Sequence, residues 1–257
     1  MARLSKRELK QYLDEKAAQY ESSEFLETDP LGVVHRADSK QDKEILGLLT
    51  ALIAWGNRKS IIKNAEKIFE ILEGQPHYFL LEHTSDEIER CAKGFVHRTF
   101  NERDLAFLLI RLKEYYRIHN SLESLFQTDT PFLNSGISNF RNFILRAPHE
   151  SRFEKHLADP SKGSAAKRIH LYLRWMVRPN QKGVDFGIWN NINTAQLSCP
   201  LDVHTARIAR QLGILKRKQN DAKALEELDI NLRAFDPLDP VKYDFALFGL
   251  GVYGDFQ

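Results

Sequence analysis

Residues 200–213 read Pro-Leu-Asp-Val-His-Thr-Ala-Arg-Ile-Ala-Arg-Gln-Leu-Gly. The proline breaks the preceding segment, and Asp202 stands where an N-cap residue accepts a hydrogen bond from the first turn of a helix. Ile208 and Leu212 follow at helical spacing, so one face of this helix is predicted to be buried. On these residues alone, capping is a sufficient role for Asp202, and His204 is a first-turn residue that the backbone can satisfy.

Helical spacing of apolar residues recurs along the rest of the chain. The clearest stripes are Ala65, Ile68, Phe69 and Leu72; Leu105, Leu108, Leu109, Leu112 and Tyr116; and Ile137, Phe140 and Ile144. The second stripe has Asn101 or Asp104 placed to cap it. No run alternates convincingly with period two, and the basic and aromatic residues 95–100 are predicted to form a loop packed on the helices. We therefore expect an all-α protein with roughly nine to twelve helices.

Bulk composition limits the classes of function. The 257 residues are 42% hydrophobic, which is ordinary for a globular protein with a core. The formal net charge of +2 makes no case for nucleic-acid binding, so the distribution of charge has to decide. The two cysteines predict no disulfide framework, zinc site or cysteine-ligated iron–sulfur cluster. A charged N-terminal segment and the lack of a long apolar run predict a cytoplasmic protein without a membrane segment. No glycine fingerprint for a nucleotide cofactor and no metal-hydrolase motif is found.

Positive charge is concentrated in residues 161–184, which hold six basic side chains and no acidic one. The six are Lys162, Lys167, Arg168, Arg174, Arg178 and Lys182. The stretch opens with a turn at Gly163 and Ser164 and runs into an apolar helix, whose N-terminal N–H groups would favour a phosphate. The alternative is a helix capped by Ser161 or Ser164 that carries a solvated basic face.

Together these segments resemble the helix-hairpin-helix (HhH-GPD) superfamily of DNA glycosylases. LDVHTARIARQLG (201–213) is similar to the D-x-H-x-x-R segment of endonuclease III-type enzymes, and GSAAKRIHLYLRWMV (163–177) resembles their hairpin. YDFALFG (243–249) resembles the helix that ends in a glycine after the catalytic Asp, and LLTALIAWGNRKSIIKNAEKIF (48–69) resembles the early helix pair. Over its whole length the chain looks most like the bacterial DUF2400 family, which is related to this superfamily and to the archaeal 8-oxoguanine glycosylases.

The resemblance implies an all-α, HhH-GPD-like fold with two helical subdomains around a central cleft, all within a single domain. Residues 41–178 would form a helical barrel with the hairpin, and residues 1–40 with 185–257 would form a second helical layer. Lys167 falls where bifunctional members carry their Schiff-base lysine, and Asp202 falls where the superfamily carries its catalytic acid.

Three features depart from the superfamily pattern. Ala165 replaces the second glycine of the hairpin and Ser164 replaces an apolar residue, which alters the turn that binds phosphate and a cation. Lys167 and Asp202 are 35 positions apart, about twice the usual separation, although the archaeal branch also lengthens this connection. The cysteines of the iron–sulfur loop are absent, so no cofactor is expected beyond a monovalent cation at the hairpin.

Base excision from duplex DNA would give these residues their roles. Flipping a nucleotide out of the duplex costs a few kcal/mol, which contacts to phosphates must supply. Asp202 would stabilise the positive charge that develops on the sugar or activate the nucleophile. Lys167 would attack C1′ as a neutral amine, which the positive end of the helix dipole and Arg168 favour. The residues expected to contact DNA are Lys162, Gly163, Ser164, Arg168, His204 and Arg207, and those expected to stack on a base are Trp175, Trp189 and Trp55.

Three interpretations follow from these patterns. The leading one is a DNA glycosylase with AP-lyase activity that acts on double-stranded DNA at the bacterial nucleoid, with an oxidised purine as the base that the archaeal branch suggests. The second is a non-catalytic duplex-DNA-binding protein on the same fold. The third is a helical protein-interaction scaffold, in which the basic stretches are solubilising faces, Lys167 is a solvated surface residue and the tryptophans belong to the core.

Overall fold

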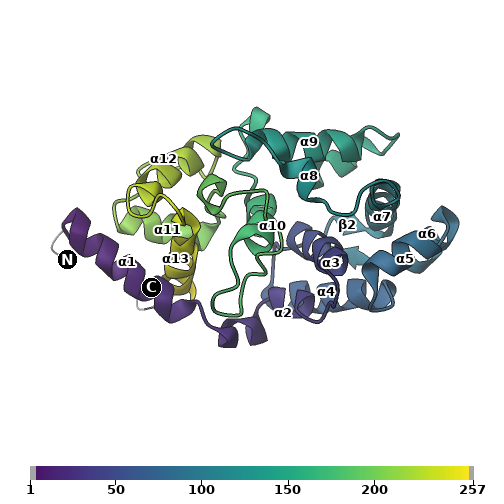
Figure 1. The fold of residues 1–257 in the computed structure, drawn as a ribbon, viewed down its shortest axis with the longest axis horizontal. Helices are drawn as coiled ribbons and strands as arrows, with labels where there is room; N and C mark the ends of the chain where they lie inside the picture. The colour runs from purple at the N-terminus through teal and green to yellow at the C-terminus, as the bar shows by residue number, and fades with distance from the viewer. Residues whose placement is uncertain (1–3, 255–257) are drawn as a thin grey trace. The chain divides into compact units, whose positions relative to one another are not determined.

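The computed structural model describes residues 4–254 and is mostly helical (Figure 1), which confirms the predicted all-α class. The α-helices are α1 (Lys6–Tyr20), α2 (Leu31–Val34), α3 (Lys40–Leu52), α4 (Arg58–Ile71), α5 (Pro76–Glu82), α6 (Ser85–Ala92), α7 (Glu102–Tyr116), α8 (Glu123–Phe126), α9 (Asn134–Leu145), α10 (Lys167–Val177), α11 (Val203–Gln211), α12 (Ala222–Arg233) and α13 (Tyr243–Val252). Short 3-10 helices are η1 (Ser23–Thr28), η2 (Ser151–His156), η3 (Pro160–Lys162), η4 (Thr194–Gln196) and η5 (Pro240–Lys242). These thirteen α-helices within residues 4–254 exceed the predicted nine to twelve, because α2 and α8 span four residues each and leave no periodic pattern.

The chain forms two compact units. The first takes in the residues up to Phe25, residues 128–135 and everything from Asp159 on, and the second takes in 26–127 and 136–158. The division predicted from the sequence instead kept 41–178 together, whereas the structure groups α10 with the C-terminal helices. The outermost residues of the predicted second layer, 1–3 and 255–257, lie outside the described part. The cleft expected between two subdomains stays a prediction.

The second unit carries the predicted apolar stripes. The stripe at 65–72 is buried and lies on α4 and the residue that follows it, and the stripe at 105–116 is buried on α7. Asn101 caps α7 and forms a reciprocal pair of bonds with Asp104, so both predicted capping residues take part. Residues 95–100, predicted as a loop, instead form the antiparallel pair β1 (Val96–His97) and β2 (Phe100–Asn101), whose strands are too short to show alternation.

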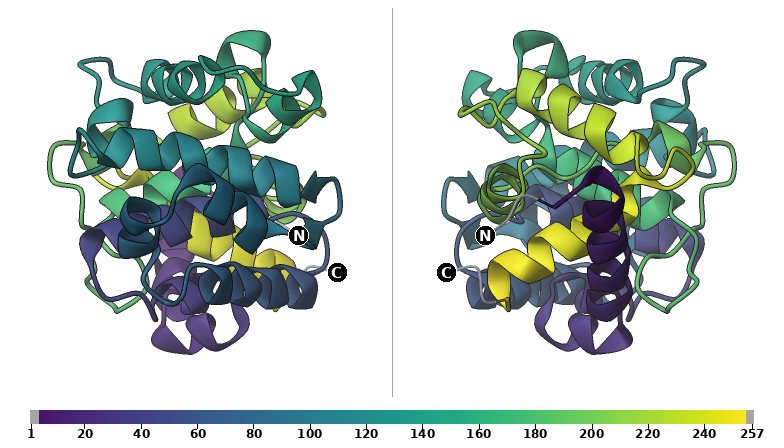
Figure 2. Two further views of the ribbon diagram at one scale, coloured as in Figure 1. Left: turned by 90° about the vertical axis from the view of Figure 1, so that its right-hand side faces the viewer. Right: turned by 90° about the vertical axis from the view of Figure 1, so that its left-hand side faces the viewer.

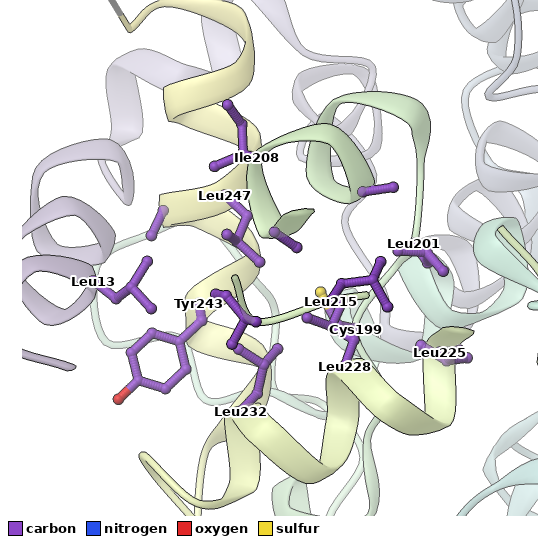
Figure 3. Close-up of a cluster of buried hydrophobic side chains, with 14 of the residues drawn as sticks. Leu13, Cys199, Leu201, Ile208, Leu215, Leu225, Leu228, Leu232, Tyr243 and Leu247 are labelled. Atoms are coloured by element: carbon purple, nitrogen blue, oxygen red, sulfur yellow. The ribbon is translucent and has the colours of Figure 1, made fainter. Parts of the chain in front are cut away.

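The first unit is built around α13, against which α1 and α11 pack (Figures 1 and 2). Figure 3 shows Leu13 of α1 beside Tyr243 and Leu247 of α13, with Ile208 of α11 above Leu247 and Leu228 of α12 below. Ile208 is buried, as its spacing predicted, and α13 is apolar around most of its surface. The core of this unit therefore joins elements from both ends of the sequence.

Gly249 permits the closest approach in this core. A Cβ at this position would collide with the ring of Tyr20, the last residue of α1, so glycine lets the two helices meet. Gly251 plays the same part on α11, because its Cβ would stand 2.9 Å from the Cβ of His204. The helix expected to end at Gly249 continues to Val252, so Gly249 serves packing rather than termination.

Candidate active site

A tight turn delivers Lys167 to the start of α10. Gly163 is left-handed at φ 84°, and a Cβ there would meet nothing within 4 Å. Ala166 is left-handed at φ 44° and is the N-cap of α10, with no side-chain cap bond. The cap predicted at Ser161 or Ser164 is therefore wrong, since Ser164 Oγ instead accepts the N–H of Ala166 at 3.1 Å. Lys167 follows as the first residue of the helix and is half-buried.

Asp202 begins α11. Its carboxylate accepts the N–H of Thr205 at 2.8 Å, which confirms the predicted N-cap. Asp202 is half-buried, and the next two residues, Val203 and His204, are exposed. The ring of His204 lies edge-on to Phe248 of α13, with 6.2 Å between ring centroids. The start of α11 thus presents an acid and an imidazole near the surface of the first unit.

Lys167 and Asp202 both act on a third residue, Asp244 of α13. Asp244 is buried and accepts from Nη1 of Arg174 and, at 3.4 Å, from Oγ1 of Thr205. Burial raises the pKa of Asp244 to about 6; the charge of Arg174 opposes the rise, Asp202 adds to it and Lys167 opposes it. The helix that Lys167 begins and the helix turn that Asp202 caps therefore both bond to one buried carboxyl of the first unit.

The sequence reasoning missed Asp244. Its segment was matched to the superfamily as a whole, without a role for the acid. A signal was present, because Asp244 is the one charged residue of the otherwise apolar α13, and a charge on a buried helix is costly unless it is paired.

Basic residues follow one face of α10 at helical spacing. Lys167, His170, Arg174 and Arg178 lie three or four positions apart along the helix. His170 is buried, and burial together with the charge of Arg233 lowers its pKa to about 4, so it is neutral at physiological pH. The two arginines form buried ion pairs with carboxylates of the same unit, which are Glu21, Asp185, Asp239 and Asp244.

The basic stretch 161–184 is therefore not a continuous surface. Arg174 and Arg178 form these internal ion pairs, so they add no positive charge to the surface. Arg168, predicted to contact DNA, is largely buried, and burial lowers its pKa to about 10. Lys162 does lie exposed, in the turn before α10. The number of basic residues in the stretch overstates the positive charge at the surface, because some side chains of a helix point toward the protein interior.

A separate group of lysines remains on the surface. The carbonyl of Gly163 accepts the N–H of Ala222 at 3.0 Å, which brings the turn before α10 to the start of α12. Arg207, also predicted to contact DNA, donates to the carbonyl of Gly251 at 2.9 Å. The exposed lysines of this region, none of which forms an ion pair within residues 4–254, are Lys162, Lys216, Lys218 and Lys223. We refer to these four as the lysine cluster.

The tryptophans predicted to stack on a base differ in their surroundings. Trp175 and Trp189 are 1% and 2% exposed, and Trp189 meets Tyr172 edge-on with 5.4 Å between ring centroids. Both are core residues, so the stacking role predicted for them has no exposed ring face through which to act. Trp55 belongs to the second unit, where it is half-buried against His97; its stacking role stays a prediction.

A cleft of about 770 Å³ opens in the second unit between α6, α7 and the segment around Glu150. Its lining carries both signs of charge over an apolar floor and consists of Asp86, Glu89, Arg90, Lys93, Glu102, Arg103, Asp104, Ala106, Phe107, Ile110, His149, Glu150 and Phe153. No residue predicted from the sequence to bind or catalyse belongs to this set. The cleft is thus a feature separate from the Lys167 site.

Within residues 4–254, no three His, Cys, Asp or Glu side chains are grouped so as to hold a metal ion. None of the helices there combines the length and the apolar character that crossing a bilayer requires. Cys91 is exposed and Cys199 buried, both as free thiols.

Comparison with protein families gives one match, over residues 29–253, to the family described as "Protein of unknown function (DUF2400)". The chain belongs to the DUF2400 family. This confirms the predicted resemblance to DUF2400, whereas the relation to the HhH-GPD superfamily stays a prediction. Comparisons with curated proteins and with solved structures gave no match. In this DUF2400 chain the matched region contains Lys167, Asp202 and Asp244 and excludes α1.

Proposed function

We propose that this DUF2400 chain is a DNA base-excision glycosylase with AP-lyase activity, related to the HhH-GPD superfamily, and that its partner is double-stranded DNA with a damaged base. The observation that carries the proposal is that the helix begun by Lys167 and the helix turn capped by Asp202, 35 positions apart in the sequence, are both bonded to the buried carboxyl of Asp244, through Arg174 and Thr205. An amine and an acid brought together near the surface are what this chemistry requires. The likeness to the archaeal branch suggests an oxidised purine as the base.

The proposed reaction uses Lys167 as the nucleophile. Its Nζ forms a bond to C1′ while the glycosidic bond breaks, and the electron pair of that bond, with a proton, leaves on the base. Asp202 stabilises the positive charge that develops on the sugar. Opening of the sugar ring, in which O4′ takes a proton, converts the amine adduct into an imine. Loss of a proton from C2′ then breaks the C3′–O bond, and the phosphate departs with the strand.

The lysine cluster supports a phosphate-binding role for the same surface. Four exposed ammonium groups on the first unit would displace counterions from a nucleic-acid backbone, which makes binding fall steeply with salt. The turn that holds Lys162 leads directly to Lys167, so phosphate contacts there would place a strand beside the proposed nucleophile. His204 and Val203 are exposed next to Asp202.

The test is chemical trapping. The protein is incubated with duplex oligonucleotides that carry 8-oxoguanine, thymine glycol, uracil or an abasic site, and borohydride then reduces any imine to a stable adduct. Lys167→Ala is expected to abolish the adduct, whereas the control Lys63→Ala, at an exposed lysine on α4 of the second unit, keeps it. Asp202→Asn is expected to lower base release while leaving the helix cap intact, because asparagine caps as well as aspartate. An adduct that survives Lys167→Ala, or no adduct on any of the four substrates, contradicts the proposal.

The lysine cluster also favours a second candidate, a duplex-DNA-binding protein without catalysis. This candidate predicts salt-sensitive gel shifts with intact duplex, no base release and equal binding by wild type and Asp202→Asn. Binding without any adduct supports it over the glycosylase. A chain with no duplex binding at low salt would instead fit the scaffold interpretation.

A further inference from the structure

Asp244 joins the elements on which the candidate site is built. From α10, Arg174 donates to one carboxylate oxygen of Asp244. From α11, Thr205 Oγ1 donates to the other oxygen at 3.4 Å. The thiol of Cys199, in the loop before α11, lies 3.7 Å from that same oxygen. One buried side chain on α13 therefore holds two helices and a loop.

Each of these contacts constrains the backbone next to a predicted catalytic residue. Asp202 caps the N–H of Thr205 at 2.8 Å, so the bond from the Thr205 hydroxyl to Asp244 fixes the first turn of α11 and the acid with it. Arg174 lies seven residues after Lys167, two turns along the same face of α10. Because Asp244 holds both helices, the approach of Lys167 to Asp202 depends on it.

We propose that Asp244 is a positioning residue, which holds Lys167 and Asp202 in register and supplies a negative charge that acts on both. The inference rests on the function proposed above, and it adds a residue to which the superfamily resemblance assigned no role. Asp244 is buried and acts through Arg174 and Thr205 rather than by touching substrate.

The charge of Asp244 gives the arrangement a pH dependence. The charged groups that face it are Arg174 and Lys167 from α10, Asp202 from the start of α11 and Asp185 from the loop after α10. Burial is the largest cause that raises the pKa of Asp244 to about 6, so the group is ionised at pH 7.5 and neutral well below pH 6. At a pH well below 6, Asp244 is therefore protonated and no longer carries a negative charge.

The experiment compares Asp244→Asn with the matched control Asp229→Asn. Asp229 is likewise buried, on α12, and burial likewise raises its pKa to about 6, but it accepts from Ser198 and, at 3.0 Å, from the N–H of Cys199. One readout is borohydride trapping on an abasic duplex between pH 5 and pH 8. The other needs no DNA: the rate at which Lys167 is reductively methylated at pH 8, followed by mass spectrometry of the peptide that contains it.

Asp244→Asn is expected to lower trapping at pH 7.5 by about tenfold to a hundredfold, as for residues that orient a catalytic group, and to remove the change in trapping near pH 6. Methylation of Lys167 is expected to change by about threefold to tenfold, because α10 is no longer held to α13 by the bond from Arg174 to Asp244. Asp229→Asn is expected to stay within about twofold of wild type in both readouts, since Asp229 bonds to the Cys199 loop but to neither Arg174 nor Thr205.

Each outcome decides between the two proposals. Unchanged methylation of Lys167 in Asp244→Asn, or an equal change in Asp229→Asn, overturns the role of Asp244. A changed methylation rate in Asp244→Asn with no adduct from wild type on any substrate supports the positioning role and contradicts the glycosylase. If Asp244→Asn fails to fold, Thr205→Val removes one bond to Asp244 at nearly constant shape. Thr205→Val must then alter methylation of Lys167 more than Asp229→Asn does, or the inference is overturned.

Discussion

Asp229 allows a sharp test of the electrostatics of the first unit. The carboxyl is buried on α12, where it accepts the N–H of Cys199 at 3.0 Å and lies 3.5 Å from Nη1 of Arg233. Burial raises its pKa from 3.8 to about 6, against the opposing effects of Ser198 and Arg233. A rise of this size corresponds to about 3 kcal/mol of stability that depends on pH.

The sign of the effect follows from which state binds the proton more tightly. The folded protein favours the protonated carboxyl, so this contribution to stability is complete below pH 3.8 and is lost as the pH rises through 6. Asp229→Asn removes that loss. The free energy of unfolding of the variant, relative to wild type, is therefore expected to increase by roughly 2 kcal/mol between pH 4.5 and pH 7.5. Any fixed cost of placing an amide at this position is the same at every pH and drops out of the comparison.

Urea denaturation at several pH values measures this difference. Glu226→Gln, which removes an exposed carboxylate from the same helix, controls for the change in net charge. A difference between Asp229→Asn and wild type that stays flat from pH 4.5 to pH 7.5, or that moves against the variant as the pH rises, would refute the reasoning. Either result would mean that burial does not penalise the charged form of Asp229.

Two further predictions concern the packing of the first unit. Gly249→Ala is expected to destabilise the protein by about 1–3 kcal/mol, since the added methyl group must displace the ring of Tyr20; an unchanged midpoint of thermal unfolding would show that α1 does not approach α13 this closely. Arg178→Met is expected to cost about 3–5 kcal/mol, because it leaves the buried Glu21 with only the more distant Lys182 and the buried Asp185 with only Arg174. The control is Lys182→Met, at a more exposed cation that lies 3.9 Å from the same Glu21. Urea denaturation measures the free energy of unfolding of both variants, and an equal loss in the two would contradict the buried-pair argument.

Local signals in the sequence predicted local structure well. The Asp202 cap, the Asn101 cap of α7 and the apolar stripes of α4 and α7 all depend on residues within about two turns of one another. Short elements escaped prediction for the same reason. A four-residue helix such as α8, or the two-residue strands of β1 and β2, contains less than one repeat of its own pattern.

The ion pairs of α10 could not be predicted from local patterns. Arg174 meets Asp244 across 70 positions of sequence, and Arg178 meets Glu21 across 157. The stretch 161–184 was interpreted as a basic surface because its own residues include no acid. The acids that neutralise it lie partly on other elements, and only the folded chain shows which basic residues keep their charge facing water.

Two departures from local preference lie on the elements that carry the candidate site. Helices α1, α11 and α12 begin at side-chain caps, whereas α10 begins at Ala166 in the left-handed conformation, which costs an ordinary residue about 1–2 kcal/mol. Burial of the Asp244 carboxyl is a second cost, next to the first turn of α11. Sequences that fold are locally consistent over most of their length and tend to break these rules at functional positions. Ala166 directly precedes Lys167, and Asp244 bonds to the helix turn that Asp202 caps. These two energetic costs therefore support a functional role for the same two residues, Lys167 and Asp202, that the motif predicts.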